Sequence, residues 1–253
     1  MLFGKVKPTV TPEDREWIEN AFLWFENEYG SDFLKSVRIV EPTRAFFDYR
    51  FTQSKEDAFY TLEKACEIMG IDSQLVELYF FNDAPMDFQE EGVFATYNPD
   101  GAEAKDGYTL GLYSESETEK FRIGVEQQLL QNPESLISTI AHELSHFKLL
   151  GENRIEENDE ELTDLNVIVF GFGIFLSNSI FNFQQWQGTS FGGWQANRSG
   201  YIPEQVATYA MALLQNYQGT EDTWSKYLKE SVRKMYNRNL RYLRKTKDEV
   251  KFK

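Results

Sequence analysis

The sequence predicts an α+β protein, on three observations. The first half contains short runs of β-branched and aromatic residues that are typical of strands, at 37–40, 75–81, 108–113 and 121–125. The second half is dominated by apolar residues three and four apart, which is typical of helices. With 253 residues, 41% of them hydrophobic, the chain is long and apolar enough to bury a sizeable core. We therefore expect one domain over residues 1–253, with a mixed-sheet, strand-bearing lobe at 1–130 and a helical lobe at 131–253.

Two helices are expected within the strand-bearing lobe. Thr11 and Pro12 form a start signal, and aromatic and aliphatic residues follow at helical spacing. Ser54 opens a second helix, which should run towards Gly70. The single cysteine, Cys66, lies in this second pattern, so we expect a buried core residue rather than a nucleophile.

The first helix of the helical lobe has the clearest boundaries. Asn132 is a suitable N-cap, and Pro133 suits the first helical position. Apolar residues then recur at three- and four-residue intervals as far as Phe147, and Gly151 supplies a stop. The pattern predicts a helix from about residue 133 to about residue 150.

Both histidines of the chain lie in that helix, at His142 and His146, and Glu143 directly follows the first. This H-E-x-x-H spacing would arise by chance in about one chain in a thousand of this length. Residues four apart lie nearly above one another on a helix, so two ring nitrogens can bind one Zn²⁺ ion. Glu143 projects beside the pair, where a carboxylate can take a proton from water at the metal.

A catalytic zinc site needs a third protein ligand, and the acidic segment 158–164 offers carboxylates at the start of a second helical run. Here the chain resembles the gluzincin metallopeptidases, in which a glutamate on the helix after the H-E-x-x-H helix binds the metal. In the thermolysin-like and membrane prenyl-protein peptidase families, an aspartate four residues later holds a ligand histidine. Glu160 and Asp164 fit that Glu-x-x-x-Asp spacing. Glu161 does not fit it, but stays open as an alternative ligand.

The resemblance covers roughly residues 132 to 176. It implies a zincin-like fold and one zinc ion bound by His142, His146 and Glu160, with Asp164 bonded to a ligand histidine. It also implies hydrolysis of a peptide bond in a peptide or protein substrate, with Glu143 as the general base.

Metallopeptidases of this class usually have a further side chain that stabilises the oxyanion. Because no histidine remains for this role, Tyr201 and Arg198 are the candidates, just before an amphipathic helical pattern at 206–214. Tyr209 within that pattern is a third candidate. Most of the 13 tyrosines must be ordinary packing residues.

The run 165–176 is apolar on nearly every side, which predicts a helix buried within the protein. Its apolar core is too short for a membrane span, since about twenty residues are needed. Gly171 and Gly173 should allow two helix backbones to approach closely.

The net charge of −15 is unevenly distributed. Residues 226–253 carry 11 basic and 3 acidic side chains, a charge of +8, which leaves −23 on residues 1–225. A strongly negative body disfavours binding to nucleic acid. We therefore expect the amphipathic, basic C-terminal segment to dock as a helix on the acidic body, with nucleic-acid binding as the weaker alternative.

These observations favour a zinc metallopeptidase, a hydrolase. No secretory signal pattern is visible near the N-terminus, so the cytoplasm is the expected location. Two other classes stay open: a non-catalytic zinc-containing binding protein on a zincin-like scaffold, and an interaction protein that acts through its basic C-terminal segment.

Overall fold

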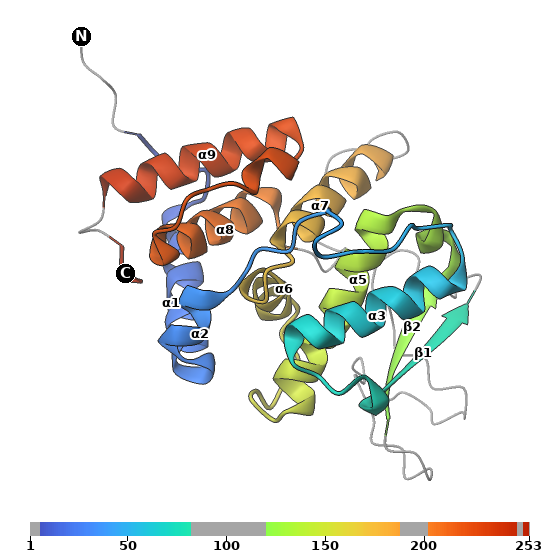
Figure 1. Ribbon diagram of the computed structural model, residues 1–253. Helices are drawn as coiled ribbons and strands as arrows, with labels where there is room; N and C mark the ends of the chain where they lie inside the picture. Colours follow the sequence, from blue (N-terminus) through green and yellow to red (C-terminus); the bar gives the residue numbers. More distant parts are fainter. Residues whose placement is uncertain (1–5, 82–119, 188–201, 247–249, 253) are drawn as a thin grey trace. The chain divides into compact units, whose positions relative to one another are not determined.

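The computed structural model describes most of the chain (Figure 1). The described residues are 6–81, 120–187, 202–246 and 250–252. They form two compact units, which are described separately below. Unit 1 holds the described residues up to 48, those from 164 to 187 and those from 202 onward, and unit 2 holds 49–81 and 120–163.

This division differs from the expected one at residue 130. The helix that carries both histidines belongs with the strands in unit 2, and the N-terminal helices belong with the C-terminal helices in unit 1. The boundary between the units falls inside helix α6 (Glu160–Val169), after Thr163.

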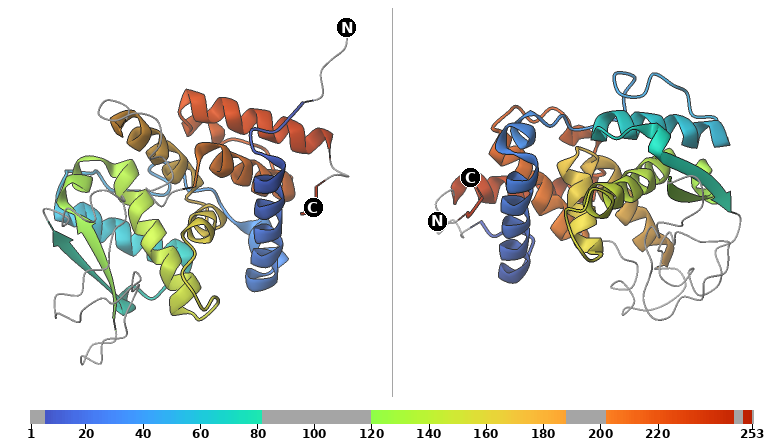
Figure 2. Two further views of the ribbon diagram at one scale, coloured as in Figure 1. Left: turned by 180° about the vertical axis from the view of Figure 1, so that it is seen from behind. Right: turned by 90° about the horizontal axis from the view of Figure 1, so that it is seen from below.

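Unit 2 contains a parallel strand pair and two longer helices. Strand β1 (Val76–Phe81) pairs with β2 (Phe121–Glu126), with Val76 opposite Phe121. Helices α3 (Lys55–Met69) and α5 (Pro133–His146) pack against each other, and α5 also contacts β2 (Figure 2). The described part of the unit also contains three short helical turns, η1 (Ser73–Leu75), η2 (Gln127–Gln131) and η3 (Phe147–Gly151), and the first turn of α6.

The expected starts of α3 and α5 are confirmed. Ser54 and Asp57 form a reciprocal capping box at α3. At α5 the Asn132 side chain accepts a hydrogen bond from the Ser135 backbone N–H at 3.2 Å, and proline occupies the first turn. Cys66 lies buried in α3, as expected, and burial raises the pKa of its thiol to about 11.

The end of α5 differs from the prediction. The α-helix stops at His146, and the chain continues to Gly151 as a single π-helical turn, η3. All residues of α5 from Ser135 to His146 are buried, although the sequence predicted one apolar face. The apolar stripe identifies one packed face, whereas burial of the remaining faces depends on the elements around the helix.

Unit 1 is helical. Its described helices are α1 (Pro12–Tyr29), α2 (Ser31–Ser36), the part of α6 after Thr163, α7 (Gly173–Gln187), α8 (Glu204–Gln218) and α9 (Glu230–Lys245), with a short turn η4 (Ser225–Tyr227). Helix α8 is the central element, since α1, α2, α7 and α9 all contact it. Figure 2 shows α8 and α9 side by side in both views.

The basic C-terminal helix packs on α8, as expected. Its inner face buries Val232, Tyr236, Leu240 and Leu243. Its basic side chains are on the exposed face: Lys234, Arg238, Arg241, Arg244 and Lys245. Beyond the helix Phe252 is again buried, with its ring 4.3 Å from that of Tyr217.

Two expected elements need correction. No strand forms at 37–40, where the Val40 backbone N–H makes an isolated bond to the Gly171 carbonyl instead of a ladder. The apolar run 165–176 is two helices, because α6 ends at Val169 and α7 begins at Gly173. Gly171 between them has a positive φ of +91°, which ends the first helix.

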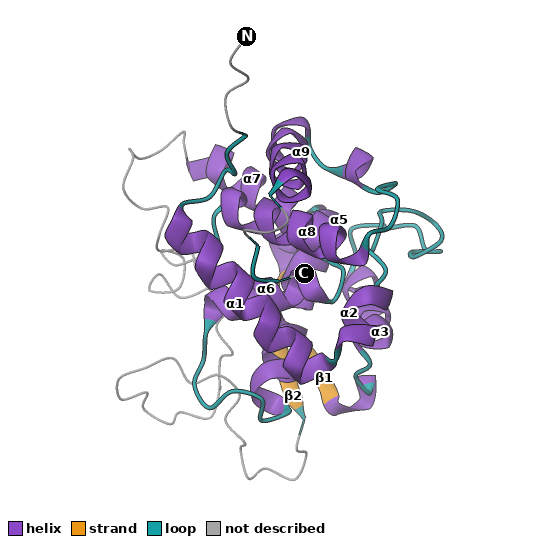
Figure 3. Cartoon of the chain, turned by 90° about the vertical axis from the view of Figure 1, so that its left-hand side faces the viewer, coloured by secondary structure: helices purple, strands orange, loops and turns teal. Residues whose placement is uncertain are grey.

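The expected strands at 75–81 and 121–125 are confirmed, and the one expected at 108–113 lies outside the described residues. Figure 3 shows that helix dominates the part of the chain that the structure describes, with β1 and β2 as its strands. The α+β class is therefore confirmed. None of the described helices combines the length and the apolar character needed to cross a lipid bilayer.

Candidate metal centre

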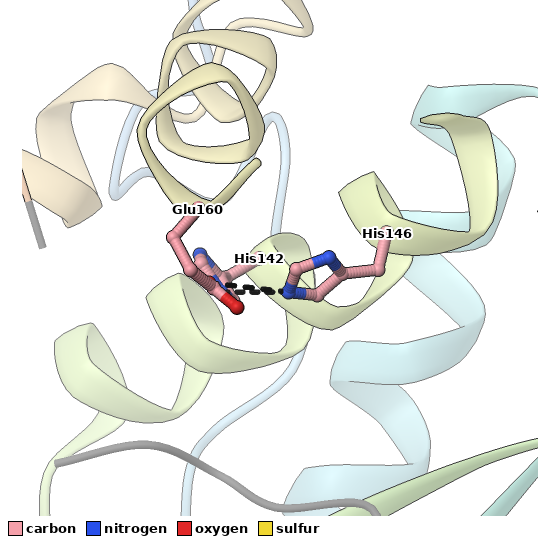
Figure 4. Close-up of side chains that lie close together, drawn as sticks. All are labelled: His142, His146 and Glu160. Carbon is pink, nitrogen blue, oxygen red and sulfur yellow. Dashed lines mark hydrogen bonds and ion pairs between the residues drawn. The ribbon is translucent and has the colours of Figure 1, made fainter. Parts of the chain in front are cut away.

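Two histidines and one glutamate of unit 2 converge on a single point (Figure 4). His142 and His146 project from α5, and Glu160 is the first residue of α6. Nε2 of His146 lies 3.1 Å from Nε2 of His142. Oε2 of Glu160 lies 3.2 Å from the first imidazole and 3.5 Å from the second.

These three separations suit a single zinc ion. Two ligand atoms about 2.1 Å from an ion, with a tetrahedral angle between them, lie about 3.4 Å apart. The observed separations of 3.1, 3.2 and 3.5 Å lie around that value. Imidazole and carboxylate are also donor types that zinc binds in proteins. The side chains present therefore fit such an ion.

Hydrogen bonds among the three side chains cannot satisfy all of these contacts. A neutral imidazole Nε2 either carries one hydrogen or offers one lone pair. If His142 donates to Glu160, it has no Nε2 lone pair to accept from His146, and the opposite choice directs its lone pair at the carboxylate. A cation at the shared point removes this conflict, because all three atoms can then direct a lone pair at the cation.

Both oxygens of the Glu160 carboxylate have partners. Its Oε2 faces the two imidazoles, while its Oε1 accepts a hydrogen bond from Nδ2 of Asn158 at 2.7 Å. Burial alone would raise the pKa of Glu160, but its bonds to His142 and His146 outweigh burial and lower the pKa. The group is therefore ionised at neutral pH, as a metal ligand must be.

Glu143 is buried beside the histidines, with 2% of its surface exposed. Its Oε2 has no hydrogen-bond partner among the residues that the structure describes. Burial raises the pKa of Glu143, and the nearby histidines partly offset that increase. A buried carboxylate with an unpartnered oxygen and a raised pKa is suited to accept a proton.

The second ring nitrogen of His146 contacts a residue that sequence reasoning missed. Nδ1 lies 3.4 Å from Oγ1 of Thr163, which is buried one turn after Glu160 on α6. Asn158 was missed as well. Both lie within five residues of Glu160. A search for hydrogen-bonding side chains close in sequence to the proposed third ligand could therefore have identified them.

The other predicted site residues are not part of this cluster. Glu161, next to Glu160, is exposed and outside the converging group. Asp164 is buried in unit 1, where its carboxylate accepts a bond from the Ile202 backbone N–H at 2.8 Å, and its role towards a histidine stays a prediction. The hydroxyl of Tyr209 donates to Glu19 in unit 1 at 2.8 Å. Tyr201 and Arg198 lie outside the described residues.

Comparison of the chain with protein-family models, with curated proteins and with solved structures finds no significant match. The geometry and chemistry of the site itself are therefore the basis for assigning a function.

Proposed function

We propose that this protein is a zinc-dependent metallopeptidase of the gluzincin type, with a zincin-like arrangement around α5. The observation that carries the proposal is the convergence of His142, His146 and Glu160 at separations of 3.1 to 3.5 Å. Glu143 on the same helix adds a buried proton acceptor. Three protein side chains would hold such an ion and leave room for solvent, which is typical of catalytic rather than structural zinc sites.

In this proposal the side chains divide the chemistry between holding the metal and moving a proton. The two imidazoles and Glu160 would hold one Zn²⁺ ion, which supplies Lewis acidity and lowers the pKa of water. Glu143 takes the proton from the attacking water and returns it to the leaving amine of the scissile peptide bond. The burial that raises the pKa of Glu143 strengthens it as a base.

Three further side chains have proposed roles at this site. Tyr201 and Arg198 are the candidates for stabilising the oxyanion, and Asp164 is the candidate partner of a ligand histidine. A peptide or protein is the substrate class, and the cytoplasm is the proposed compartment.

Substitution of Glu143 by glutamine tests the catalytic part of the proposal. We expect Glu143→Gln to retain one zinc per chain by elemental analysis, because the residue is not a ligand. Cleavage of a peptide library should fall at least about a hundredfold, since the base is lost. Glu134→Gln, on the first turn of the same helix, is the matched control and should cleave like the unsubstituted protein.

A Glu143→Gln variant that still cleaves at the original rate would remove the base assignment. If the unsubstituted protein binds zinc stoichiometrically but cleaves no peptide of the library, the non-catalytic binding protein replaces the enzyme.

The neighbouring pair Glu160 and Glu161 tests the ligand set. The structure brings only the first of them to the histidines, so Glu160→Ala should lose most of the bound zinc and Glu161→Ala should keep it. Metal content after dialysis against a weak chelator distinguishes the two variants. Loss of zinc from Glu161→Ala alone would contradict the proposed ligand set.

A further inference from the structure

Thr163 has one hydroxyl hydrogen and two neighbours that could receive it. Its side chain is fully buried. Oγ1 lies 2.8 Å from the carbonyl oxygen of Asp159 and 3.4 Å from Nδ1 of His146. A carbonyl oxygen only accepts, so the hydroxyl hydrogen points at Asp159. The oxygen of the hydroxyl is then left as an acceptor facing the imidazole.

This arrangement selects one form of His146. An acceptor at Nδ1 favours the ring form in which Nδ1 carries the hydrogen, and the lone pair is then on Nε2. Nε2 is the atom that faces His142 and Glu160. We propose that Thr163 is a positioning residue of the metal centre, which holds His146 in the form that binds metal through Nε2. This inference rests on the proposed metal site.

The acceptor of the threonine hydroxyl is itself fixed by the start of α6. The Asp159 side chain accepts a bond from the Leu162 backbone N–H at 2.9 Å, in the manner of a helix N-cap. The Asp159 carbonyl also accepts from the Thr163 backbone N–H at 2.9 Å. The first turn of α6 thus presents Glu160 and orients His146 at the same time.

A threonine bonded to the carbonyl four residues earlier is not unusual in this chain. On α3, buried Thr61 donates to the Asp57 carbonyl at 2.7 Å in the same way. The contact with a ligand imidazole distinguishes Thr163. Thr61 lies in the same unit and therefore provides a matched control for loss of a buried helical hydroxyl.

The test compares zinc affinity among variants of the full chain. Thr163→Val keeps the shape of the side chain but removes the hydroxyl, and Thr163→Ala removes it without a β-branched side chain, in case the valine variant does not fold. Loss of a group that orients a metal ligand typically lowers metal affinity by about 10- to 100-fold. We expect zinc affinity to fall by about tenfold in both variants, at the lower end of that range, because the 3.4 Å separation between Thr163 Oγ1 and His146 Nδ1 is long for a hydrogen bond. Thr163→Ser and Thr61→Val should stay within about threefold of the unsubstituted protein. Competition with a chromophoric chelator measures these affinities.

A second readout is specific to orientation of the ring. The chain has only two histidines, so the ring N–H signals of the zinc-loaded protein are readily assigned by NMR. The Nδ1–H proton of His146 should move upfield in Thr163→Val and keep its position in Thr61→Val, because only the first change removes its acceptor. A merely structural role of Thr163 would not move this signal selectively.

Failure of this inference is distinguishable from failure of the proposed function. If the unsubstituted protein binds no zinc, the metal site itself is wrong. If it binds zinc and Thr163→Val or Thr163→Ala binds equally tightly with an unchanged ring signal, the proposed metal site stands and the role of Thr163 is overturned.

Discussion

Buried carboxylates of unit 2 have different ionisation properties because their neighbours differ. Glu143 has an unpartnered oxygen, and burial raises its pKa. Asp57 is equally buried, but its carboxylate accepts backbone N–H bonds from Thr52 at 2.8 Å and Gln53 at 2.7 Å. Burial alone would raise the pKa of Asp57. The backbone bonds and a further bond from the Tyr49 hydroxyl outweigh the effect of burial, so the pKa is lowered. The first group is suited to proton transfer and the second to stabilising the fold.

We predict that Asp57→Asn lowers the free energy of unfolding by about 2 kcal/mol at neutral pH. Hydrogen bonds to a charged group contribute about 1.5–3 kcal/mol, and a neutral asparagine oxygen would accept the backbone N–H bonds of Thr52 and Gln53 without that charge. Urea denaturation measures the difference. Glu67→Gln, at an exposed carboxylate paired with Lys64, is the matched control and should change stability by less than about 0.5 kcal/mol.

The Asp57 effect should also depend on pH with a definite sign. Because the pKa of Asp57 is lower in the folded state, its ionised form stabilises the protein above the unfolded-state pKa of about 4. This stabilisation is lost as the pH falls through the folded-state pKa. The difference between the unsubstituted protein and Asp57→Asn should therefore be constant from pH 7 to about pH 5 and shrink below about pH 4. If the difference in unfolding free energy between the two proteins grows on acidification, the pKa of Asp57 is not lowered in the folded state.

The connection between α6 and α7 shows how one backbone position separates two helices. Gly171 has a φ of +91°, and its carbonyl accepts a bond from the Val40 backbone N–H at 2.9 Å. A Cβ atom at this position would lie 2.4 Å from the Arg38 carbonyl oxygen. The close approach is therefore to the backbone of Arg38 and Ile39, which lies outside any helix or strand, whereas Gly173 faces the Met211 side chain on α8. The sequence predicted close approach of two helix backbones at these glycines, which is wrong: Gly171 approaches a backbone segment outside any helix, and Gly173 approaches a side chain.

We predict that Gly171→Ala destabilises the protein by about 3 kcal/mol. A left-handed conformation costs an L-residue about 1–3 kcal/mol, and overlap with backbone atoms adds to that cost. Gly219→Ala is the control, since Gly219 also has a positive φ of +65° but has open space around its Cβ position. It should cost only about 1 kcal/mol. Equal losses for the two variants in thermal or urea unfolding would show that the contact with Arg38 contributes nothing.

All the proposed metal ligands belong to one compact unit, together with Glu143 and Thr163. A ligand that binds only the folded state stabilises that state in proportion to the logarithm of its concentration over Kd. Zinc should therefore stabilise unit 2, whose α5 contributes two of the ligands.

We predict that zinc at a free concentration about 1,000 times its Kd raises the free energy of unfolding of unit 2 by about 4 kcal/mol. Thermal unfolding with and without a chelator, together with hydrogen exchange at the amides of α5, measures this effect. His146→Ala removes a ligand and should abolish the response to zinc. An equal response in that variant would place the metal elsewhere.

The features that were predictable from the sequence depend on residues close together in the chain. The pair His142 and His146 shares a helix face because a helix repeats every 3.6 residues. The starts of α3 and α5 were predictable because their capping bonds join residues three apart. The choice of Glu160 came from a resemblance in spacing, and the structure then brought this carboxylate to the two imidazoles.

Other features depend on which elements meet in space, and only the tertiary structure decided them. Thr163 contacts a histidine 17 positions earlier because the first turn of α6 lies against α5. Residues 37–40 form no strand, and the two helices separate at Gly171. One hydrogen bond, from the Val40 backbone N–H to the Gly171 carbonyl, links these two distant segments. Helical bonds and caps are local, so periodicity and cap residues reveal them. Contacts between elements are selected by packing of the whole chain, which no local pattern specifies.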